Sequence, residues 1–410
     1  MAERDAAAAS LFDDRLARRN ALILALAQGC ASFVGVTNVN FGGYVGQTLS
    51  ADKSLATLPM TTMMLGTFLA TVPMGLVMQR FGRRFGFLLG AGLGIVGGLA
   101  CVHAIEIGNF WLFCLGTHFA GYYQSSASYY RFAAADTASP AFRPTAISWS
   151  LAGGLLAAVV APEILSRTRE LWLPFAASFF AIACSAALGF VLVASVRIPR
   201  PAAPAAAAKQ GRPLVEIIRQ PRFIAALAAG IVSFGMMNLV MTSTPLAMAA
   251  CSYTPDDATR AIRWHVLAMY VPSFFTGNLI ARFGRQRMAL IGMLLLVGCG
   301  LIALSGISLM QFTAAMIALG LGWNFSYISA TTMVTDCHLP DERGKTQAFN
   351  DLAVFGFVAL TSYMAGRLMN SVGWAGVNWT IFPFVAIAAA LVLAMPFLGR
   401  VRRIAVGSDP

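Results

Sequence analysis

The sequence predicts an all-α membrane protein with twelve transmembrane helices in two six-helix halves. Of its 410 residues, 58% are hydrophobic and only 11% are charged, whereas a soluble domain carries about 25% charged residues. Long apolar runs alternate with short basic loops along the chain, and two of these loops, one in each half, have similar sequences. These three observations predict helices that cross a lipid bilayer and an internal repeat.

The apolar runs are long enough to be transmembrane helices, which need roughly 20 residues each. They lie at about 21–46, 57–79, 86–105, 110–133, 144–165, 171–195, 222–248, 261–281, 288–307, 309–334, 346–369 and 378–398. Each run should be helical because the backbone must satisfy its own hydrogen bonds inside a bilayer. We therefore expect a six-helix bundle over 1–196 and a second over 222–410, joined by a Pro- and Ala-rich cytoplasmic linker over 197–221.

The basic residues indicate how the chain is oriented. The net charge of +12 would suit nucleic acid, but the basic residues recur in short loops and form no patch, so no nucleic-acid partner is expected. Most of the 29 lysine and arginine residues fall in the loops on one side. Because positive loops stay in the cytoplasm, we expect a multi-pass protein of the bacterial inner membrane with both termini cytoplasmic.

The two similar loops extend into a longer repeat. The sequence "RFGR" occurs at 80–83 and again at 282–285. A second pair, "DTASPAFR" at 136–143 and "DCHLPDER" at 336–343, lies two spans later in each half. The halves are therefore in parallel register, which is the layout of transporters that rock around a binding site near the bilayer midplane.

The pattern G-x-x-x-x-R-x-G-R-R between the second and third spans resembles the signature loop of the major facilitator superfamily. The resemblance covers the whole chain through the span count, the linker and both loop pairs. In that family the loop arginine pairs with an acid at the cytoplasmic end of the fourth helix and closes the inward gate. The resemblance thus implies two gate pairs, Arg83 with Asp136 and Arg285 with Asp336.

One feature of the family loop is missing. The family usually has an aspartate just before the first basic residue, where this chain has Gln79 and Ala281. A weaker latch is therefore expected. The alternative is that the loop arginines only anchor the topology.

The resemblance also implies that the first, fourth, seventh and tenth spans line the central cavity. Polar and aromatic residues concentrate on these four spans, which suits a flat, partly polar solute. The candidate solute-binding residues are Asn38, Asn40, Tyr44, His118, Tyr122, Tyr123, Gln124, Asn238, Trp323, Asn324 and Tyr327. The alternative is that these side chains hold helices together.

Two charges and one histidine within the spans have separate interpretations. Arg131 and Asp351 are expected to pair across the two halves as an additional inward gate, with solute binding by Arg131 as the alternative. His118 is the one ionisable side chain well inside a cavity span, which makes it a candidate proton site. A structural role for His118 and facilitated diffusion without protons remain open.

The sequence holds no motif for catalysis, nucleotide binding or metal binding. Its four histidines lie in four different segments without metal-ligand spacing. We therefore expect no enzyme activity, no cofactor and no metal, and a monomer whose transport is driven by a gradient, as a symporter or a uniporter.

The residues favour uptake of a nutrient. The fifth span has Pro162 after Ala161 but lacks the glycines of the GxxxGPxxGG signature of drug antiporters. The stretches "YYRFAAAD", "LGWNFSYISATTMVTD" and "FNDLAVFG" are similar to bacterial riboflavin carriers of the superfamily. The predicted function is rocker-switch uptake of riboflavin or a similar flat vitamin. The alternatives are an efflux carrier for amphipathic compounds and a membrane receptor that transports nothing.

Overall fold

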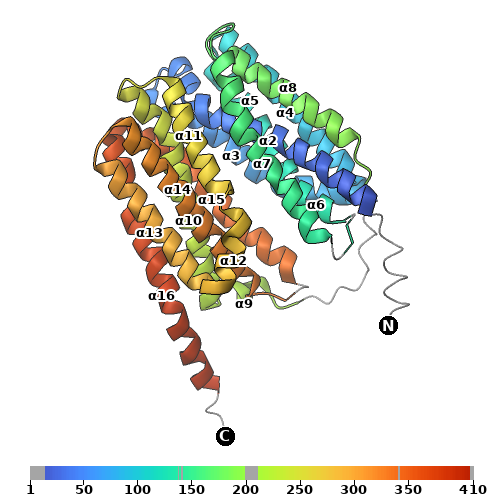
Figure 1. Cartoon of the computed structure of the whole chain (residues 1–410), viewed down its shortest axis with the longest axis vertical. Coiled ribbons are helices and arrows are strands. Elements are labelled where there is room, and N and C mark those ends of the chain that lie inside the picture. Colours follow the sequence, from blue (N-terminus) through green and yellow to red (C-terminus); the bar gives the residue numbers. More distant parts are fainter. Residues whose placement is uncertain (1–13, 137, 140–141, 199–210, 340–341, 407–410) are drawn as a thin grey trace. The chain divides into compact units, whose positions relative to one another are not determined.

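The computed structural model describes residues 14–136, 138–139, 142–198, 211–339 and 342–406. The described residues form helices and no strand (Figure 1). They divide into two compact units, Met1–Ala203 and Pro204–Pro410. The all-α prediction is confirmed, and each unit is described by itself.

The first unit holds the first six predicted spans. Its helices are α2 (Asp14–Leu49), α3 (Leu58–Phe81), α4 (Arg83–Glu106), α5 (Phe110–Ala127), α6 (Tyr130–Asp136), α7 (Arg143–Thr168) and α8 (Ala176–Ala194), with the short 3₁₀ helix η1 (Lys53–Leu55) after α2. The fourth predicted span is not continuous, because it breaks into α5 and α6. Helix α2 packs against α7 and α8, and α4 packs between α5 and α8 (Figure 1).

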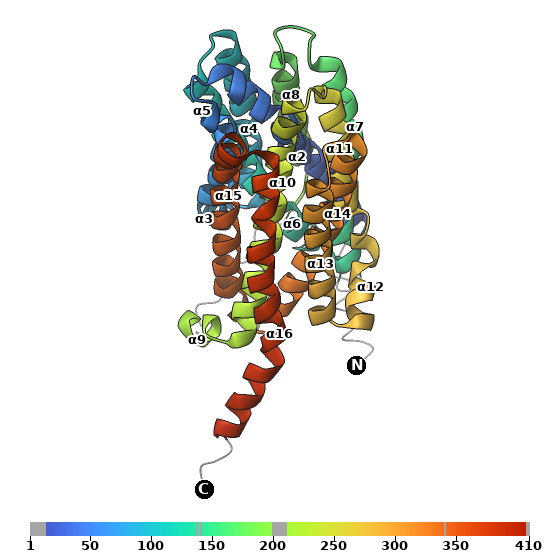
Figure 2. The same ribbon diagram turned by 90° about the vertical axis from the view of Figure 1, so that its left-hand side faces the viewer.

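The second unit holds the other six predicted spans. Its helices are α9 (Leu214–Ile218), α10 (Pro221–Ala250), α11 (Pro255–Tyr270), α12 (Ser273–Phe283), α13 (Arg285–Leu304), α14 (Leu309–Thr335), α15 (Arg343–Trp379) and α16 (Ile381–Val406). The eighth predicted span is broken, since α11 and α12 meet at an angle of 46°. Helix α14 packs against α10, α11 and α13, and α16 lies along α10 and α13 (Figure 2).

Close helix packing depends on small residues. A Cβ built at Gly97 of α4 would lie 2.6 Å from the carbonyl oxygen of Gly116 of α5. The second unit repeats this approach, because a Cβ at Gly292 of α13 would lie 2.3 Å from the backbone nitrogen of Ser326 of α14. Only glycine lets the two backbones come so near each other.

The repeated basic loops have the same backbone shape in both units. Helix α3 gives way to α4 at Gly82 (φ 91°, ψ 155°), and α12 gives way to α13 at Gly284 (φ 85°, ψ 151°). Glycine adopts these angles readily, whereas a residue with a Cβ would be strained. The sequence repeat is thus a structural repeat, in which an arginine directly follows each glycine.

Among the residues that the structure describes, seven helical segments are long and apolar enough to cross a membrane, and the bent pair α11–α12 would make eight. One of the seven, Lys345–Met395, contains the eleventh predicted span and most of the twelfth. Helices α5 and α14 are not among the seven, although they occupy two of the predicted spans. These two helices carry most of the predicted solute-binding residues.

Candidate functional site

Each unit brings together an arginine and an aspartate that the sequence predicts as a pair. In the first unit, Arg83 at the start of α4 lies with its Nε 2.5 Å from Oδ2 of Asp136 at the end of α6. The Nε–H of Arg83 is not aligned as a hydrogen-bond donor, so the contact is an ion pair. In the second unit, Arg285 at the start of α13 forms an ion pair with Asp336 at the end of α14.

Both ion pairs are partly hydrated. The exposed fractions of the side chains are 19% and 40% for Arg83 and Asp136, and 42% and 37% for Arg285 and Asp336. Pairs with this much exposure contribute only about 0–1 kcal/mol each, because water screens them. Such contacts can open and close at small cost, as a gate requires.

A pocket of about 480 Å³ lies beside the second ion pair. Arg285 and Asp336 line it together with Arg222 and Gln286. Ala281 also lines this pocket. It stands where the family loop has an aspartate, so its small side chain leaves space beside Arg285.

The asparagines of α2 are used in helix packing. Asn38 is buried and its Nδ2 lies 2.9 Å from the Met63 sulfur of α3. Asn40 is also buried and donates from Nδ2 to the carbonyl of Val36 at 2.8 Å. The Oδ1 atoms of both side chains have no hydrogen-bond partner among the described residues. The Asn38 donor thus contacts the neighbouring helix α3, whereas the Asn40 donor bonds back to α2 itself.

Tyr44, His118, Tyr122 and Gln124 are only half-buried. The ring of Tyr44 stacks on Phe175 with centroids 5.9 Å apart. His118 has Nδ1 3.1 Å from the carbonyl oxygen of Thr62, and its ring meets the Tyr122 ring edge-on at 5.3 Å. Gln124 packs against α2. These side chains are partly exposed within the first unit.

Tyr123 lies in the core of the first unit. Its side chain is fully buried, and its hydroxyl would lie 2.2 Å from a Cβ built at Gly189 of α8. Its ring would lie 2.7 Å from a Cβ at Gly94 of α4. The ring fills a space between helices that two glycines leave open. Solute binding by Tyr123 stays a prediction, and in this conformation its side chain packs between helices.

The amides predicted in the second unit also hold helices together. Asn238 donates from Nδ2 to the carbonyl of Val358 at 3.2 Å and lies 3.3 Å from Thr361 Oγ1, joining α10 to α15. Asn324 is fully buried and makes three contacts of 2.6 Å with the bent pair α11–α12. Direct solute binding by Asn324 is therefore not supported.

The Asn324 contacts explain how the bend is held. Its Nδ2 donates to the carbonyl of Met269 on α11 and to Ser273 Oγ on α12, while its Oδ1 accepts from Thr276 Oγ1. Pro272 lies at the break and has no backbone N–H to continue the helix. The amide therefore supplies hydrogen bonds that the broken backbone lacks.

Five aromatic side chains gather in the second unit, and we call them the aromatic cluster. Trp323 and Tyr327 stack at 5.3 Å, and Phe234 of α10 meets both rings edge-on at 5.6 and 5.1 Å. Tyr270 lies 6.3 Å from Trp323, and Phe355 lies 5.7 Å from Phe234. Trp323 is 8% exposed, and its Nε1 has no hydrogen-bond partner among the described residues. The cluster thus combines ring faces with a buried N–H donor that has no partner among the described residues.

Three members of the aromatic cluster were not predicted from the sequence. Phe234, Tyr270 and Phe355 lie on mostly apolar spans, where aromatic residues usually fill the core. Phe234 lies four residues before Asn238 and so on the same helix face. That spacing was the one available signal.

The predicted pair of Arg131 and Asp351 has one member in each unit. Arg131 is exposed, and its guanidinium lies 4.8 Å from the centre of the Phe132 ring. Asp351 is half-buried and its Oδ1 accepts from Asn350 Nδ2 at 3.1 Å. Their pairing stays a prediction. In the part of the chain that the structure describes, no three His, Cys, Asp or Glu side chains form a metal site.

Comparison with known protein families shows to which family this chain belongs. The family model of the Major Facilitator Superfamily matches residues 21–261 and 258–406. The chain belongs to the major facilitator superfamily. It is therefore a multi-pass membrane protein of a transporter family.

Individual members of the superfamily match over nearly the whole chain. The chain is 45% identical to the riboflavin transporter RfnT of Brucella anthropi over 381 residues, which are 92% of this chain and 96% of that protein. It is 27% identical to the uncharacterized transporter YddS of Bacillus subtilis, over 89% of this chain and 87% of that protein.

Solved structures share the superfamily fold. A D-xylose–proton symporter superimposes with a TM-score of 0.72 at 17% identity, over 92% of this chain and 96% of that chain. The nucleoside transporter NupG superimposes with a TM-score of 0.69 at 16% identity, over 93% and 99%.

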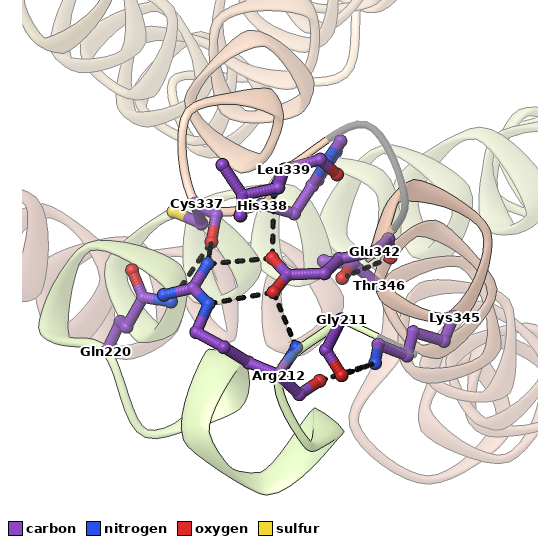
Figure 3. A network of polar contacts seen from close by, with 9 residues as sticks. All are labelled: Gly211, Arg212, Gln220, Cys337, His338, Leu339, Glu342, Lys345 and Thr346. Atoms are coloured by element: carbon purple, nitrogen blue, oxygen red, sulfur yellow. Dashed lines mark hydrogen bonds and ion pairs between the residues drawn. The ribbon is translucent and has the colours of Figure 1, made fainter. Parts of the chain in front are cut away.

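A polar network beside the second ion pair has no counterpart among the sequence predictions (Figure 3). The buried Glu342 carboxylate accepts hydrogen bonds from the backbone N, Nε and Nη2 of Arg212 at 2.8, 2.8 and 2.7 Å, and from Leu339 N at 2.9 Å. The Arg212 guanidinium, followed by the backbone N–H donors, lowers the pKa of Glu342 to about 2. Glu342 gave no sequence signal because its partner lies 130 residues earlier.

Proposed function

We propose that this protein takes up riboflavin, or a similar flat vitamin, as a secondary transporter of the bacterial inner membrane. The observation that carries the proposal is the 45% identity, over nearly the full length of both chains, to a protein named as a riboflavin transporter. Identity at this level over 92% of the chain extends well beyond the shared fold.

The aromatic cluster suits the chemistry of this solute. The isoalloxazine ring of a flavin is flat and carries carbonyl and nitrogen acceptors along one edge. Offset or edge-on aromatic contacts favour such a ring. The Trp323 Nε1–H is buried without a partner among the described residues, and we propose that it donates to an acceptor on that edge once the aromatic cluster opens to the solute. We propose that the rings of Phe234 and Tyr327 contact the flat face of the solute.

Alternating access would proceed by rocking of the two units about a shared site, as in other transporters with internal repeats. In this proposal the ion pairs Arg83–Asp136 and Arg285–Asp336 are latches on the cytoplasmic side, and Arg131 and Asp351 pair across the units. If so, reversing both charges of Arg131 and Asp351 restores the transport that either single reversal abolishes. Absence of rescue rejects this third pair.

The coupling ion is part of the proposal. His118 keeps part of its surface free and is the candidate proton site, which would make the protein a proton symporter. A protein without coupling would be a uniporter. We further propose a monomer built of bundles 1–196 and 222–410 with a cytoplasmic linker 197–221 and both termini in the cytoplasm, without enzyme activity.

Two measurements test the function. Expression in a bacterial riboflavin auxotroph should restore growth at low external riboflavin. Purified protein in liposomes preloaded with unlabelled riboflavin should accumulate labelled riboflavin by counterflow. Counterflow without auxotroph rescue would indicate efflux, and flavin binding without counterflow would indicate a receptor. Absence of both binding and counterflow would reject riboflavin as the solute.

A further inference from the structure

The segment that leads into α10 is bound to the loop that follows α14 (Figure 3). The carbonyl of Cys337 accepts hydrogen bonds from Nη2 of Arg212 at 3.3 Å and from Nε2 of Gln220 at 3.0 Å. Cys337 directly follows Asp336, the acid of the second ion pair. Two side chains from 211–220 therefore hold the backbone next to that acid.

The same arginine also holds the far end of the loop. Glu342, the N-cap residue of α15, is fully buried, and its carboxylate accepts hydrogen bonds from Nε and Nη2 of Arg212. Lys345, one turn into α15, donates from Nζ to the carbonyl of Gly211 at 3.1 Å. Arg212 thus bonds to both ends of the loop, at the Cys337 carbonyl and at the Glu342 carboxylate. We call these contacts of Arg212, Gln220 and Glu342 the loop clamp.

The first unit holds the equivalent loop from the equivalent segment. Asp14, at the start of α2, accepts hydrogen bonds from Ser139 N at 3.1 Å and Ser139 Oγ at 2.9 Å. The Arg18 guanidinium lies 5.5 Å from the centre of the Phe142 ring. In the loop repeat, Phe142 occupies the position that Glu342 occupies in the second unit.

The two units therefore use different chemistry at one place. In the second unit residues that precede α10 hold the loop that follows the latch acid, and in the first unit residues in the first two turns of α2 hold the equivalent loop. The contacting residues differ in type between the two units, but in both units the start of the unit contacts this loop. This pattern points to a role for the connection itself, since a duplicated contact without a role could be lost in either half.

From this arrangement we propose that Arg212 and Glu342 are positioning residues that hold Asp336 against Arg285, and so set how readily that ion pair opens. The inference rests on the proposed gating role of the Arg285–Asp336 pair. The buried, charge-assisted contacts of Glu342 are the stronger ones, and the half-exposed ion pair is the weaker. The loop clamp therefore stays closed when the ion pair opens. It then keeps Asp336 near Arg285, so that the ion pair can form again.

The loop clamp is not itself a proton switch. The pKa of Glu342 is about 2, chiefly because the Arg212 side chain donates to it. The carboxylate is charged at every physiological pH. Its influence on the ion pair should therefore be constant between pH 5 and pH 8.

A cysteine at Thr332 can report opening of the ion pair without any solute. Thr332 lines the pocket beside Arg285 and Asp336 and is half-buried. The exposed Cys184 and half-buried Cys251 are first replaced by serine to lower background labelling. The rate at which a fluorescent maleimide labels Thr332→Cys in the purified, full-length protein is then measured.

The test is a double-mutant cycle in the Thr332→Cys background. Asp336→Asn and Glu342→Gln should each raise the labelling rate by about fivefold, and combining them should add nothing to Asp336→Asn alone. Arg212→Lys should have an intermediate effect because lysine cannot bind a carboxylate with two parallel donors. Glu216→Gln and Arg219→Gln, at exposed positions on or next to α9, are the matched controls and should leave the rate unchanged.

The outcomes separate the inference from the function on which it rests. Unchanged labelling in Glu342→Gln, or effects of Glu342→Gln and Asp336→Asn that multiply, would overturn the positioning role. Unchanged labelling in Asp336→Asn would reject the gating role itself, whereas lack of riboflavin counterflow would reject only the solute. If Glu342→Gln does not fold, Gln220→Ala removes one donor to Cys337 and must still raise the rate.

Discussion

Trp323 and Tyr327, one turn apart on α14, stack with ring centroids 5.3 Å apart and ring planes inclined by 16°. The pair forms the centre of the aromatic cluster, and only the Trp323 indole N–H lacks a hydrogen-bond partner among the described donors of these two rings. A stacked pair next to a free donor is suited to bind a flat solute by its face and its edge. The two contributions can be separated by substitution.

Replacing Tyr327 by leucine should weaken riboflavin binding by about tenfold, because an aromatic contact contributes about 0.5–1.5 kcal/mol beyond its buried area. Trp323→Phe keeps a ring and removes the N–H donor, so it should weaken binding by a smaller factor. Quenching of flavin fluorescence by the purified protein measures the Kd. Trp374→Phe is the matched control, since Trp374 is a similarly buried tryptophan with an unpaired Nε1 on α15. Equal effects at Trp323 and Trp374 would contradict the assignment.

The buried position of Tyr123 leads to a prediction about packing. A Cβ at Gly189 would lie 2.2 Å from the Tyr123 hydroxyl, so Gly189→Ala should lower stability by about 1–3 kcal/mol through overpacking. Adding Tyr123→Phe removes the clashing oxygen and should restore most of the loss. Thermal unfolding of the purified variants measures both effects.

The control for this prediction is Gly298→Ala. A Cβ built at Gly298 meets nothing within 4 Å, and the substitution should leave the melting temperature unchanged. If Tyr123→Phe alone abolished riboflavin binding while the protein stayed folded, Tyr123 would act in the solute site and not only in packing.

Asn324 should stabilise the folded protein, because it bonds to both helices at the bend between α11 and α12. Asn324→Leu removes the contacts of Asn324 with Met269, Ser273 and Thr276 at the bend between α11 and α12, although Thr276 Oγ1 still donates to the Pro272 carbonyl at 2.8 Å. Each buried polar group that loses its partner costs about 1–3 kcal/mol. We expect a lower melting temperature for Asn324→Leu than for Asn238→Leu, whose contacts are longer at 3.2 and 3.3 Å. A larger loss for Asn238→Leu would show that the amide does not support the bend.

The low pKa of Glu342 predicts how stability changes in acid. Its folded pKa of about 2 lies below the ordinary value of 4.5. A carboxyl whose pKa is depressed by folding stabilises the protein above pH 4.5, and that contribution is lost as the pH falls toward 2. Glu342→Gln should therefore lower the melting temperature at pH 7 and should flatten its decline between pH 4.5 and pH 2.

Melting curves at several pH values, with Glu216→Gln as the matched control, measure this effect. Glu216 is an exposed carboxyl on α9, and its replacement should leave the acid dependence as in the unmodified protein. An acid decline that is equally steep in Glu342→Gln would mean that other carboxyls dominate it.

Periodic and repeated features of the molecule could be predicted from the sequence, and features set by side-chain orientation could not. The apolar runs predicted the helices, and the "RFGR" repeat predicted two matching loops, because lipid and backbone sterics act locally. Tyr122 and Tyr123 are adjacent in sequence, but only Tyr123 enters the core. Which of the two does so depends on how the neighbouring helices surround α5.

Partners that lie far apart in the sequence could not be predicted either. Glu342 is bound by Arg212, and nothing near either residue in the sequence indicates the other. The breaks in the fourth and eighth spans were also not predicted, because each break lies inside a long run that is mostly apolar, and Pro272 marks only the second break. At that break Asn324 compensates for the lost backbone hydrogen bonds, so a polar residue predicted for the solute instead supports the helix.

The second ion pair has an unfavourable position on its own helices, which gives the last prediction. Arg285 is the first residue of α13, where the helix dipole is positive, and Asp336 follows the last turn of α14, where it is negative. Each charge at such a position costs about 0.3–1 kcal/mol. Neutralising both, in Arg285→Gln with Asp336→Asn, should leave the protein as stable as before or more stable, while each single change should destabilise it.

Transport activity should fall in the double variant, although its stability does not. If the pair is a latch, the double variant binds riboflavin normally but loses counterflow activity, because the open and closed states are no longer balanced. Melting temperature, flavin binding and counterflow are measured on the same preparations. A double variant that is less stable than either single variant would show that the pair is kept for stability, and one with normal counterflow would remove its role as a gate.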